Sequence, residues 1–257
     1  MIAALLCLLM TPVKPDSGGY VRVPGGAFTS ALESEGEQGP VRVGAFLLMR
    51  RPVTNGEFLA FVRSHPGWQR GKQPSIYADA QYLARWAGPR ELGPGVEAEQ
   101  PVVEVSWFAA TAYCEAQGAR LPQFREWEYA SAADAHQADA RKDPSWRQAI
   151  LDWYAKPSRA ALAKVGSAAP NVYGIQDLHG LVWEWVEDYS ALGLASDNRA
   201  AGGADKLALC GGSALTMKDR ENYPIAMRVA MLSALGAKDT TMNLGFRCAK
   251  SLPEAKP

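Results

Sequence analysis

The sequence has few of the residues that build a metal centre or a polyanion-binding surface. It contains three histidines in 257 residues, His65, His136 and His179, and these are far apart, so a compact multi-histidine metal motif is absent. The 27 Lys and Arg residues balance 27 Asp and Glu residues, giving a formal net charge of zero. Because phosphate backbones and anionic membranes attract clustered positive charge, this balance argues against nucleic acid as a partner.

Long hydrophobic runs are also missing, and no segment reaches the roughly 20 apolar residues that span a bilayer. The apolar run at residues 2–10 instead has the length of the hydrophobic part of a secretory signal. Residues 1–17 are therefore predicted to be a signal peptide or a disordered N-terminus, and the protein to be secreted or periplasmic. No basic residue precedes the run and no clean cleavage site follows it, so a buried first strand or helix is the alternative.

Cysteine is scarce, with Cys7 in the apolar run and Cys114, Cys210 and Cys248 after it. Removal of a signal peptide leaves three thiols, an odd number. An oxidising compartment favours one disulfide among them and leaves one thiol over, and three pairings are open.

Glycine (24) and proline (17) are abundant, which is typical of a loop-rich fold and not of a helical bundle. With 47% hydrophobic residues, the chain is long enough to bury a substantial core. We expect one domain over residues 18–250 and a C-terminal tail over residues 251–257.

Three segments carry helix signals. Thr54 and Glu57 form a capping box that opens a helix ended by Pro66-Gly67. Ser106 can cap a second helix over 107–117, and a third begins after Leu121 with Pro122 in its first turn.

Strands are predicted at residues 20–28 (broken by Pro24-Gly25-Gly26), 41–49, 101–105, 182–186 and 244–249. Residues 68–100 are predicted to be a long surface connection and residues 135–170 to be irregular, while residues 225–235 fit a helix or a strand. Few helices, short strands and long loops indicate an α+β domain.

The order of several motifs along the chain is more informative than any one of them. In sequence they are Pro52–Phe58 (PVTNGEF), Pro101–Trp107 (PVVEVSW), Ala112–Cys114 (AYC), Ala119–Ala130 (ARLPQFREWEYA), Asn171–Trp185 (NVYGIQDLHGLVWEW), Gly211–Ser213 (GGS) and Asn243–Cys248 (NLGFRC). This series resembles the formylglycine-generating enzyme (sulfatase-modifying factor) family over roughly residues 20–250. The resemblance implies an α+β fold related to the C-type lectins, poor in regular secondary structure.

The resemblance also implies a disulfide and a calcium site. In the family the cysteine of the AYC segment pairs with that of the GFRC strand, which implies a Cys114–Cys248 disulfide. A structural calcium ion would take the side chains of Asp177 and Glu184 and the carbonyls of Gly180 and Val182. Calcium favours six to eight oxygen ligands and accepts carbonyls. Local hydrogen bonding of the two carboxylates is the alternative.

The sequence departs from the family at its catalytic cysteines. The family's oxidases use two cysteines that bind copper(I), between the GGS turn and the NLGFRC strand. Residues 214–242 of this chain contain no cysteine, and Pro224 falls near the second family position. Since thiolates suit copper(I), their absence makes the usual sulfatase-activating oxidation improbable.

Polar residues occupy the interval instead, and we expect them to line a ligand-binding groove: Arg220, Glu221, Asn222, Tyr223 and Arg228. A solvated loop is the alternative for such a charge run. Cys210 is the candidate catalytic thiol, and with the methionines nearby it could make a copper(I) site, although such methionines more often fill a core.

Two functions follow from these features. The first is an exported accessory or binding protein with a protein or peptide partner. Family members without the cysteine pair are encoded near bacterial nitrite reductases and copper proteins, and the C-terminal segment is similar to theirs, which implies a periplasmic redox enzyme as the partner. The second is a copper-dependent oxidoreductase using Cys210 and new ligands. A lectin-like sugar-binding module has no dedicated motif in the sequence.

Overall fold

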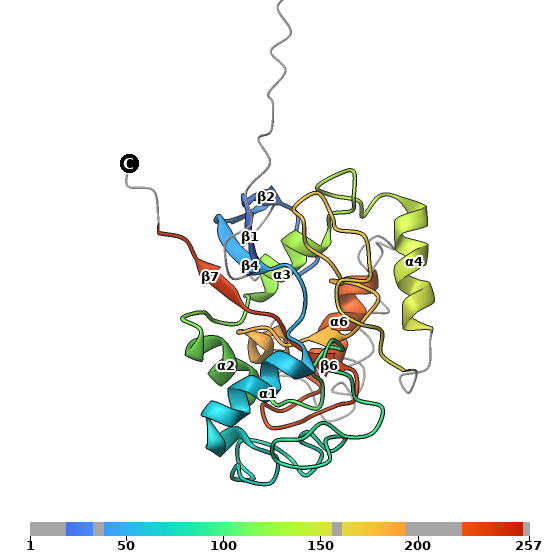
Figure 1. The fold of residues 1–257 in the computed structure, drawn as a ribbon. Coiled ribbons are helices and arrows are strands. Elements are labelled where there is room, and N and C mark those ends of the chain that lie inside the picture. Colours follow the sequence, from blue (N-terminus) through green and yellow to red (C-terminus); the bar gives the residue numbers. More distant parts are fainter. Residues whose placement is uncertain (1–18, 33–38, 156–160, 194–222, 254–257) are drawn as a thin grey trace, which may run out of the picture.

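The computed structural model describes residues 19–32, 39–155, 161–193 and 223–253 (Figure 1). Cys7, Cys210, Arg220, Glu221 and Asn222 lie outside these residues. Within the described part, no helix combines the length and the apolar character that crossing a membrane requires.

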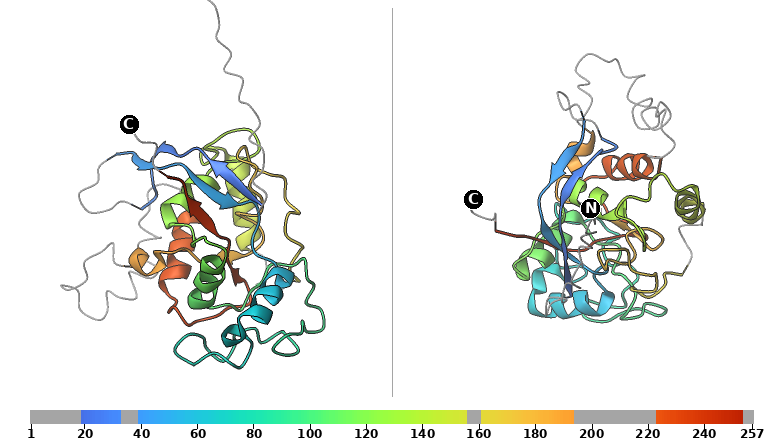
Figure 2. Two further views of the ribbon diagram at one scale, coloured as in Figure 1. Left: turned by 60° about the vertical axis from the view of Figure 1, so that its left-hand side comes forward. Right: turned by 90° about the horizontal axis from the view of Figure 1, so that it is seen from above.

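The main sheet joins the two ends of the domain. Its strands are β1 (Tyr20–Val23), β4 (Phe46–Met49) and β7 (Ala249–Ser251), all antiparallel, with β4 in the centre. Val23 pairs with Phe46, and Leu48 pairs with both Val21 and Ala249. The views in Figures 1 and 2 show this sheet along one side of the molecule.

Two smaller pairings complete the strands. β2 (Gly26–Phe28) pairs antiparallel with β3 (Val41–Val43), and β5 (Trp183–Glu184) pairs parallel with β6 (Leu244–Gly245). The predicted break within 20–28 is therefore confirmed. The segments 41–49 and 244–249 each contribute to two different sheets.

The predicted strand at residues 101–105 is wrong. Only an isolated bridge between Thr54 and Pro101 forms there, and Glu104 has a φ of 58°. This left-handed conformation interrupts an extended strand. Val102 and Val105 are nevertheless fully buried, so the hydrophobic run marked core residues correctly.

The helix signals before residue 132 are confirmed. α1 (Asn55–Ser64) begins with the Thr54–Glu57 capping box, and α2 (Trp107–Ala116) is capped by Ser106. α3 (Phe124–Ser131) begins two residues later than the Pro122 signal suggested, because Gln123 is its N-cap. The ambiguous segment near 225–235 is helical as α6 (Tyr223–Ser233).

Two segments differ from the expectation of irregular or surface structure. Residues 135–170 contain the helix α4 (Pro144–Tyr154), in which Asp143 is the N-cap and Pro144 occupies the first turn. Residues 68–100 contribute Tyr82, Leu83 and Trp86 to the core. Two short 3₁₀ helices complete the elements, η1 (Pro66–Trp68) and η2 (Tyr189–Gly193).

The core lies between the main sheet and helices α1, α2 and α3. The rings of Phe58, Tyr113 and Phe246 meet there, with the Phe58 centroid 5.8 Å from Tyr113 and 6.1 Å from Phe246. Close by, Cys114 of α2 and Cys248 form a disulfide across 134 residues of sequence. A disulfide that closes a loop of this length stabilises a domain by about 4–5 kcal/mol, because it lowers the entropy of the unfolded chain.

Candidate functional site

A buried ion pair organises the centre of the WEW segment. The Glu184 carboxylate accepts from the guanidinium of Arg247, with N–O distances of 2.8 to 3.0 Å, and both side chains are fully buried. Trp127 Nε1 donates to the same carboxylate at 2.9 Å. Because every contact is away from water, each charge depends on the other for compensation.

Arg247 also binds the carbonyls around it. Its Nη1 donates to the carbonyls of Met49 (3.1 Å) and Arg50 (3.2 Å), and its Nη2 donates to that of Gln176 (2.9 Å). One cationic side chain is therefore surrounded by a carboxylate and three carbonyls. This side chain connects β4, the loop before β5 and the end of the chain.

These contacts bear on the calcium site implied for Asp177, Gly180, Val182 and Glu184. Both oxygens of Glu184 already face Arg247. A divalent cation at that carboxylate would share it with a buried positive charge. Glu184 therefore does not fit the role of a calcium ligand.

Asp177 also has protein partners. Its carboxylate accepts from the backbone N–H groups of Gly166 and of Ala168, the latter at 3.2 Å. The local hydrogen-bonding alternative thus describes Asp177 well. In the described part of the chain, no three His, Cys, Asp or Glu side chains gather closely enough to hold a metal. Calcium binding by the chain stays a prediction.

Arg228 is a second buried guanidinium, and its position corrects the expectation that it lines an exposed groove. It is 1% exposed, its Cζ lies 3.6 Å from the ring centroid of Trp127, and its Nη2 donates to the backbone carbonyl of Glu184. Its Nε has no hydrogen-bond partner in the described residues. Desolvation lowers the pKa of Arg228 to about 10, even though the negative charge of Glu184 acts to raise it. Arg228 therefore anchors α6 to the interior.

His179 packs beside this cluster. Its ring meets Trp127 and Trp146 edge to face, with both centroids 5.5 Å away, and its Nε2 lies 3.0 Å from the Ser131 carbonyl. Desolvation lowers the pKa of His179 to about 4, so the ring is neutral at pH 7 and Nε2 carries its proton. His179 is therefore a buried histidine bonded to the local backbone.

The start of α6 carries the residue that the resemblance places near the second family cysteine. Pro224 is in the first turn of α6, and its carbonyl accepts from Tyr154 Oη of α4 at 2.8 Å. The Tyr154 ring stacks on Trp183 with centroids 5.0 Å apart. Position 224 therefore presents a proline carbonyl held by an aromatic cluster, and no thiol.

An aromatic stripe runs from the surface to the WEW segment. It consists of Tyr77, Phe108, Trp107, Tyr189 and Trp185, and neighbouring centroids are 5.0 to 5.9 Å apart. Tyr77 is 40% exposed at the outer end, while the last two rings are buried.

Hydrogen bonds fix the inner part of the stripe. Trp107 Nε1 donates to the carbonyl of Val186 at 3.0 Å, and Trp185 Nε1 donates to that of Val105 at 2.9 Å. η2, which supplies Tyr189, packs against α6. The stripe is therefore a rigid row of rings whose buried end lies beside α6, the helix that carries Pro224.

Of the other predicted site residues, Tyr223 opens α6, but its side chain lies outside what the structure describes, as do Cys210, Arg220, Glu221 and Asn222. The predicted groove therefore stays a prediction. Sequence reasoning missed the stripe and the role of Arg247. Aromatic residues in VSW and WEW were visible signals, but nothing in the sequence places Tyr77 beside them.

The described structure is an α+β domain with short strands and long ordered loops. A family model described as "Sulfatase-modifying factor enzyme 1-like domain" matches residues 9–252. The chain belongs to this formylglycine-generating enzyme family and has its α+β fold.

Similar proteins include both inactive and active members by name. The chain is 31% identical to the inactive C-alpha-formylglycine-generating enzyme 2 of Mus musculus. The aligned region covers 92% of this chain and 87% of that protein. It is 30% identical to the formylglycine-generating enzyme of Streptomyces coelicolor, covering 90% and 88% respectively. Among solved structures, PvdO from Pseudomonas aeruginosa is similar at 21% identity, with a TM-score of 0.48 and coverage of 91% and 94%.

Proposed function

We propose that this chain is an exported accessory protein that binds a protein or peptide partner and does not catalyse formylglycine formation. The partner class we propose is a periplasmic redox or copper enzyme that needs maturation. The observation that carries the proposal is the absence of cysteine from residues 214–242, the interval in which the resemblance places the family's copper-binding pair.

The distribution of the cysteines supports this proposal. Cys114 and Cys248 are joined to each other in the core, so neither thiol is available to copper(I). Of the two remaining cysteines, Cys7 lies in the predicted signal and Cys210 precedes the interval. A two-thiolate copper site of the family's kind therefore lacks its ligands.

The aromatic stripe supports the binding role. Aromatic side chains contribute large contact area with little conformational entropy to lose, and they are enriched where proteins bind one another. The exposed end at Ile76 (66% exposed) and Tyr77 gives a partner an apolar entry to the stripe. Phe108 and Trp107 extend this surface inward toward α6.

The catalytic part of the proposal is tested with a cysteine-containing sulfatase peptide, copper(I) and oxygen. Mass spectrometry should detect no conversion of the cysteine by this chain, while the Streptomyces coelicolor enzyme in the same buffer converts it. Formation of formylglycine by this chain would overturn the proposal. Copper(I) titration of the wild type and Cys210→Ser tests the alternative oxidoreductase, which predicts tight binding that the substitution abolishes.

The binding part is tested in the native host. Tagged wild type, Tyr77→Ala and Val172→Ala are recovered from the exported fraction, and associated proteins are quantified by mass spectrometry. Val172 is the matched control because it is similarly exposed (44%) and lies outside the stripe. We expect Tyr77→Ala to lose a redox enzyme that the other two retain. Equal recovery by all three would contradict the role of the stripe.

A further inference from the structure

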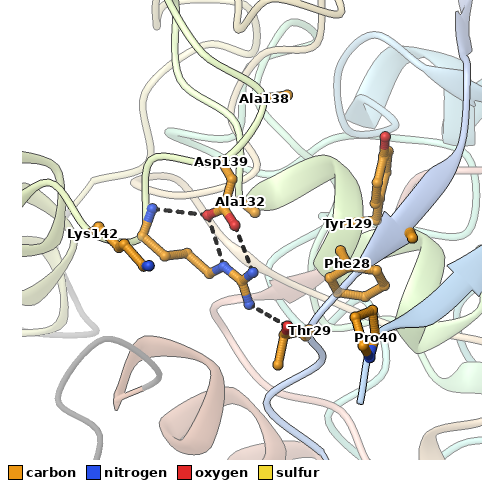
Figure 3. Close-up of a pocket in the computed structure, with 10 residues that line it drawn as sticks. Phe28, Thr29, Pro40, Tyr129, Ala132, Ala138, Asp139 and Lys142 are labelled. Carbon is orange, nitrogen blue, oxygen red and sulfur yellow. Dashed lines mark hydrogen bonds and ion pairs between the residues drawn. The ribbon is translucent and has the colours of Figure 1, made fainter.

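A cavity of about 570 Å³ lies between the β2–β3 hairpin, the end of α3 and the loop before α4 (Figure 3). It shares no lining residue with the aromatic stripe or the Arg228 cluster. Cavities that hold small organic ligands are typically about 300–1,000 Å³ and combine apolar walls with a few polar groups. The cavity therefore has the size of a small-molecule site, separate from the proposed partner surface.

One wall of the cavity is aromatic and rigid. Phe28 and Tyr129 meet edge to face with centroids 5.4 Å apart, and Tyr129 Oη donates to the Gly25 carbonyl at 2.8 Å. On its other side, Tyr129 stacks on Tyr173 with centroids 5.9 Å apart. Pro40 lies next to Phe28 on the same side of the cavity in Figure 3. This wall suits the edge or face of a planar ring.

The opposite wall is charged. Arg141 binds both carboxylate oxygens of Asp139, at 2.9 and 2.7 Å, and also donates to the Thr29 carbonyl at 2.6 Å. The Asp139 carboxylate therefore largely neutralises Arg141, and the bond to Thr29 holds this wall against the segment that follows β2. Lys142 is exposed beside it and forms no salt bridge with another described residue. Asp139 and the nearby Glu128 both act on Arg141, so the exposed Lys142 is the cation on this wall that is available to an anion.

The two walls come together at Phe28, where Arg141 Cζ lies 5.8 Å from the ring centroid, and small side chains leave the rest of the cavity open. Ala27, Ala132 and Ala138 line the cavity, where any larger residue would reduce its volume. Ala132 is buried at 4% exposure in the C-cap of α3, whereas Ala138 is exposed at the rim. A substitution at position 138 can therefore fill the cavity with little disturbance of the core.

We propose that this cavity binds a small organic anion with a planar ring. The ring packs against Phe28, Pro40 and Tyr129, and the carboxylate or phosphate of the ligand pairs with Lys142. The proposal is independent of the proposed function, because the cavity and the aromatic stripe are built from different residues.

The test uses 2-naphthoate as the probe, with 2-naphthamide as its uncharged counterpart and 2-naphthyl phosphate as a second anion. Binding to the full chain is measured by isothermal titration calorimetry and by saturation-transfer NMR. We expect both anions to bind saturably and the amide to bind about fivefold or more weakly, since a charge-assisted contact contributes about 1 kcal/mol or more. Comparison of the two anions identifies which acidic group the charged wall prefers.

Three variants locate the site. Ala138→Phe should abolish binding, and Lys142→Gln should reduce the affinity for 2-naphthoate to that for the amide. Lys164→Gln is the matched control, because Lys164 is also exposed but pairs with Glu97 and Glu99 away from the cavity, and it should bind normally. Thermal unfolding of each variant verifies that it is folded.

Absence of saturable binding to wild type, or unchanged binding to folded Ala138→Phe, would overturn the proposal. Equal affinity for the acid and the amide would refute the role assigned to Lys142 and with it the anionic class of ligand.

Discussion

The buried Glu184–Arg247 pair makes a sharp prediction about stability. Glu184→Gln keeps the shape of the side chain and an oxygen that can accept from Trp127 Nε1, but it removes the negative charge. Arg247 then keeps its charge in a fully buried site, and Arg228 loses the nearest charge that favours its protonated form. The variant therefore leaves two buried guanidinium groups without a compensating carboxylate.

The expected loss is about 3–5 kcal/mol, the range seen when one partner of a buried ion pair is removed. Domains unfold with a total of about 5–15 kcal/mol, so this loss would take a large part of the stability. The exposed pair of Lys164 and Glu97, at 3.4 Å with side chains 60% and 55% exposed, provides the comparison. Its removal by Glu97→Gln should change the stability by about 1 kcal/mol or less.

Urea unfolding followed by tryptophan fluorescence measures these differences. A double-mutant cycle measures the interaction free energy between the two side chains. It uses Glu184→Gln, Arg247→Met and the double variant. We expect a value near the top of the range of about 0.5–3 kcal/mol found for contacting residues. Failure of Glu184→Gln to fold, with Glu97→Gln folding normally, agrees with the same reasoning. A loss no larger than that of Glu97→Gln would refute it.

Further predictions concern the disulfide, metal dependence and pH. A digest of the unreduced protein should contain Cys114 linked to Cys248, and Cys114→Ala should lower the unfolding free energy by about 2–5 kcal/mol; two free thiols at these positions would contradict the pairing. Because Glu184 faces Arg247, EDTA should leave the melting temperature within about 1 °C, whereas a large drop reversed by calcium would show that a calcium site supports the fold. The pKa of His179 is lowered to about 4 in the folded protein, so between about pH 6.5 and 4 the proton binds to the unfolded state and not to the folded state. The free energy of unfolding should therefore fall as the pH decreases through this range, and His179→Phe should flatten this part of the pH profile.

The fold was most predictable where local chemistry decides the backbone. The Thr54–Glu57 capping box and the Ser106 cap place α1 and α2 because side-chain acceptors satisfy the first free N–H groups of a helix. Asp143-Pro144 is a similar start signal for α4, but the irregular surroundings concealed it.

Burial in irregular segments was not predictable in this way. Leu83 is fully buried, and its N–H donates to the carbonyl of Glu104 at 2.9 Å, a contact across 21 residues that no periodic pattern in the sequence indicates. The same limit applies to Arg228. It is the single charged residue in the apolar run of residues 224–232, and its contacts with Trp127 and with the Glu184 carbonyl, 101 and 44 residues earlier, explain how this side chain becomes part of the interior.

The central position of β4 has a consequence for how the chain acquires its structure. β4 pairs with β1 nearby in sequence, but its other edge pairs with β7, and the Leu48–Ala249 contact is separated by about 200 residues. During synthesis that edge has no native neighbour until residues 249–251 have left the ribosome. An unpaired strand edge is prone to wrong pairing, and long-range contacts form slowly. Completion of the sheet is therefore a late folding event.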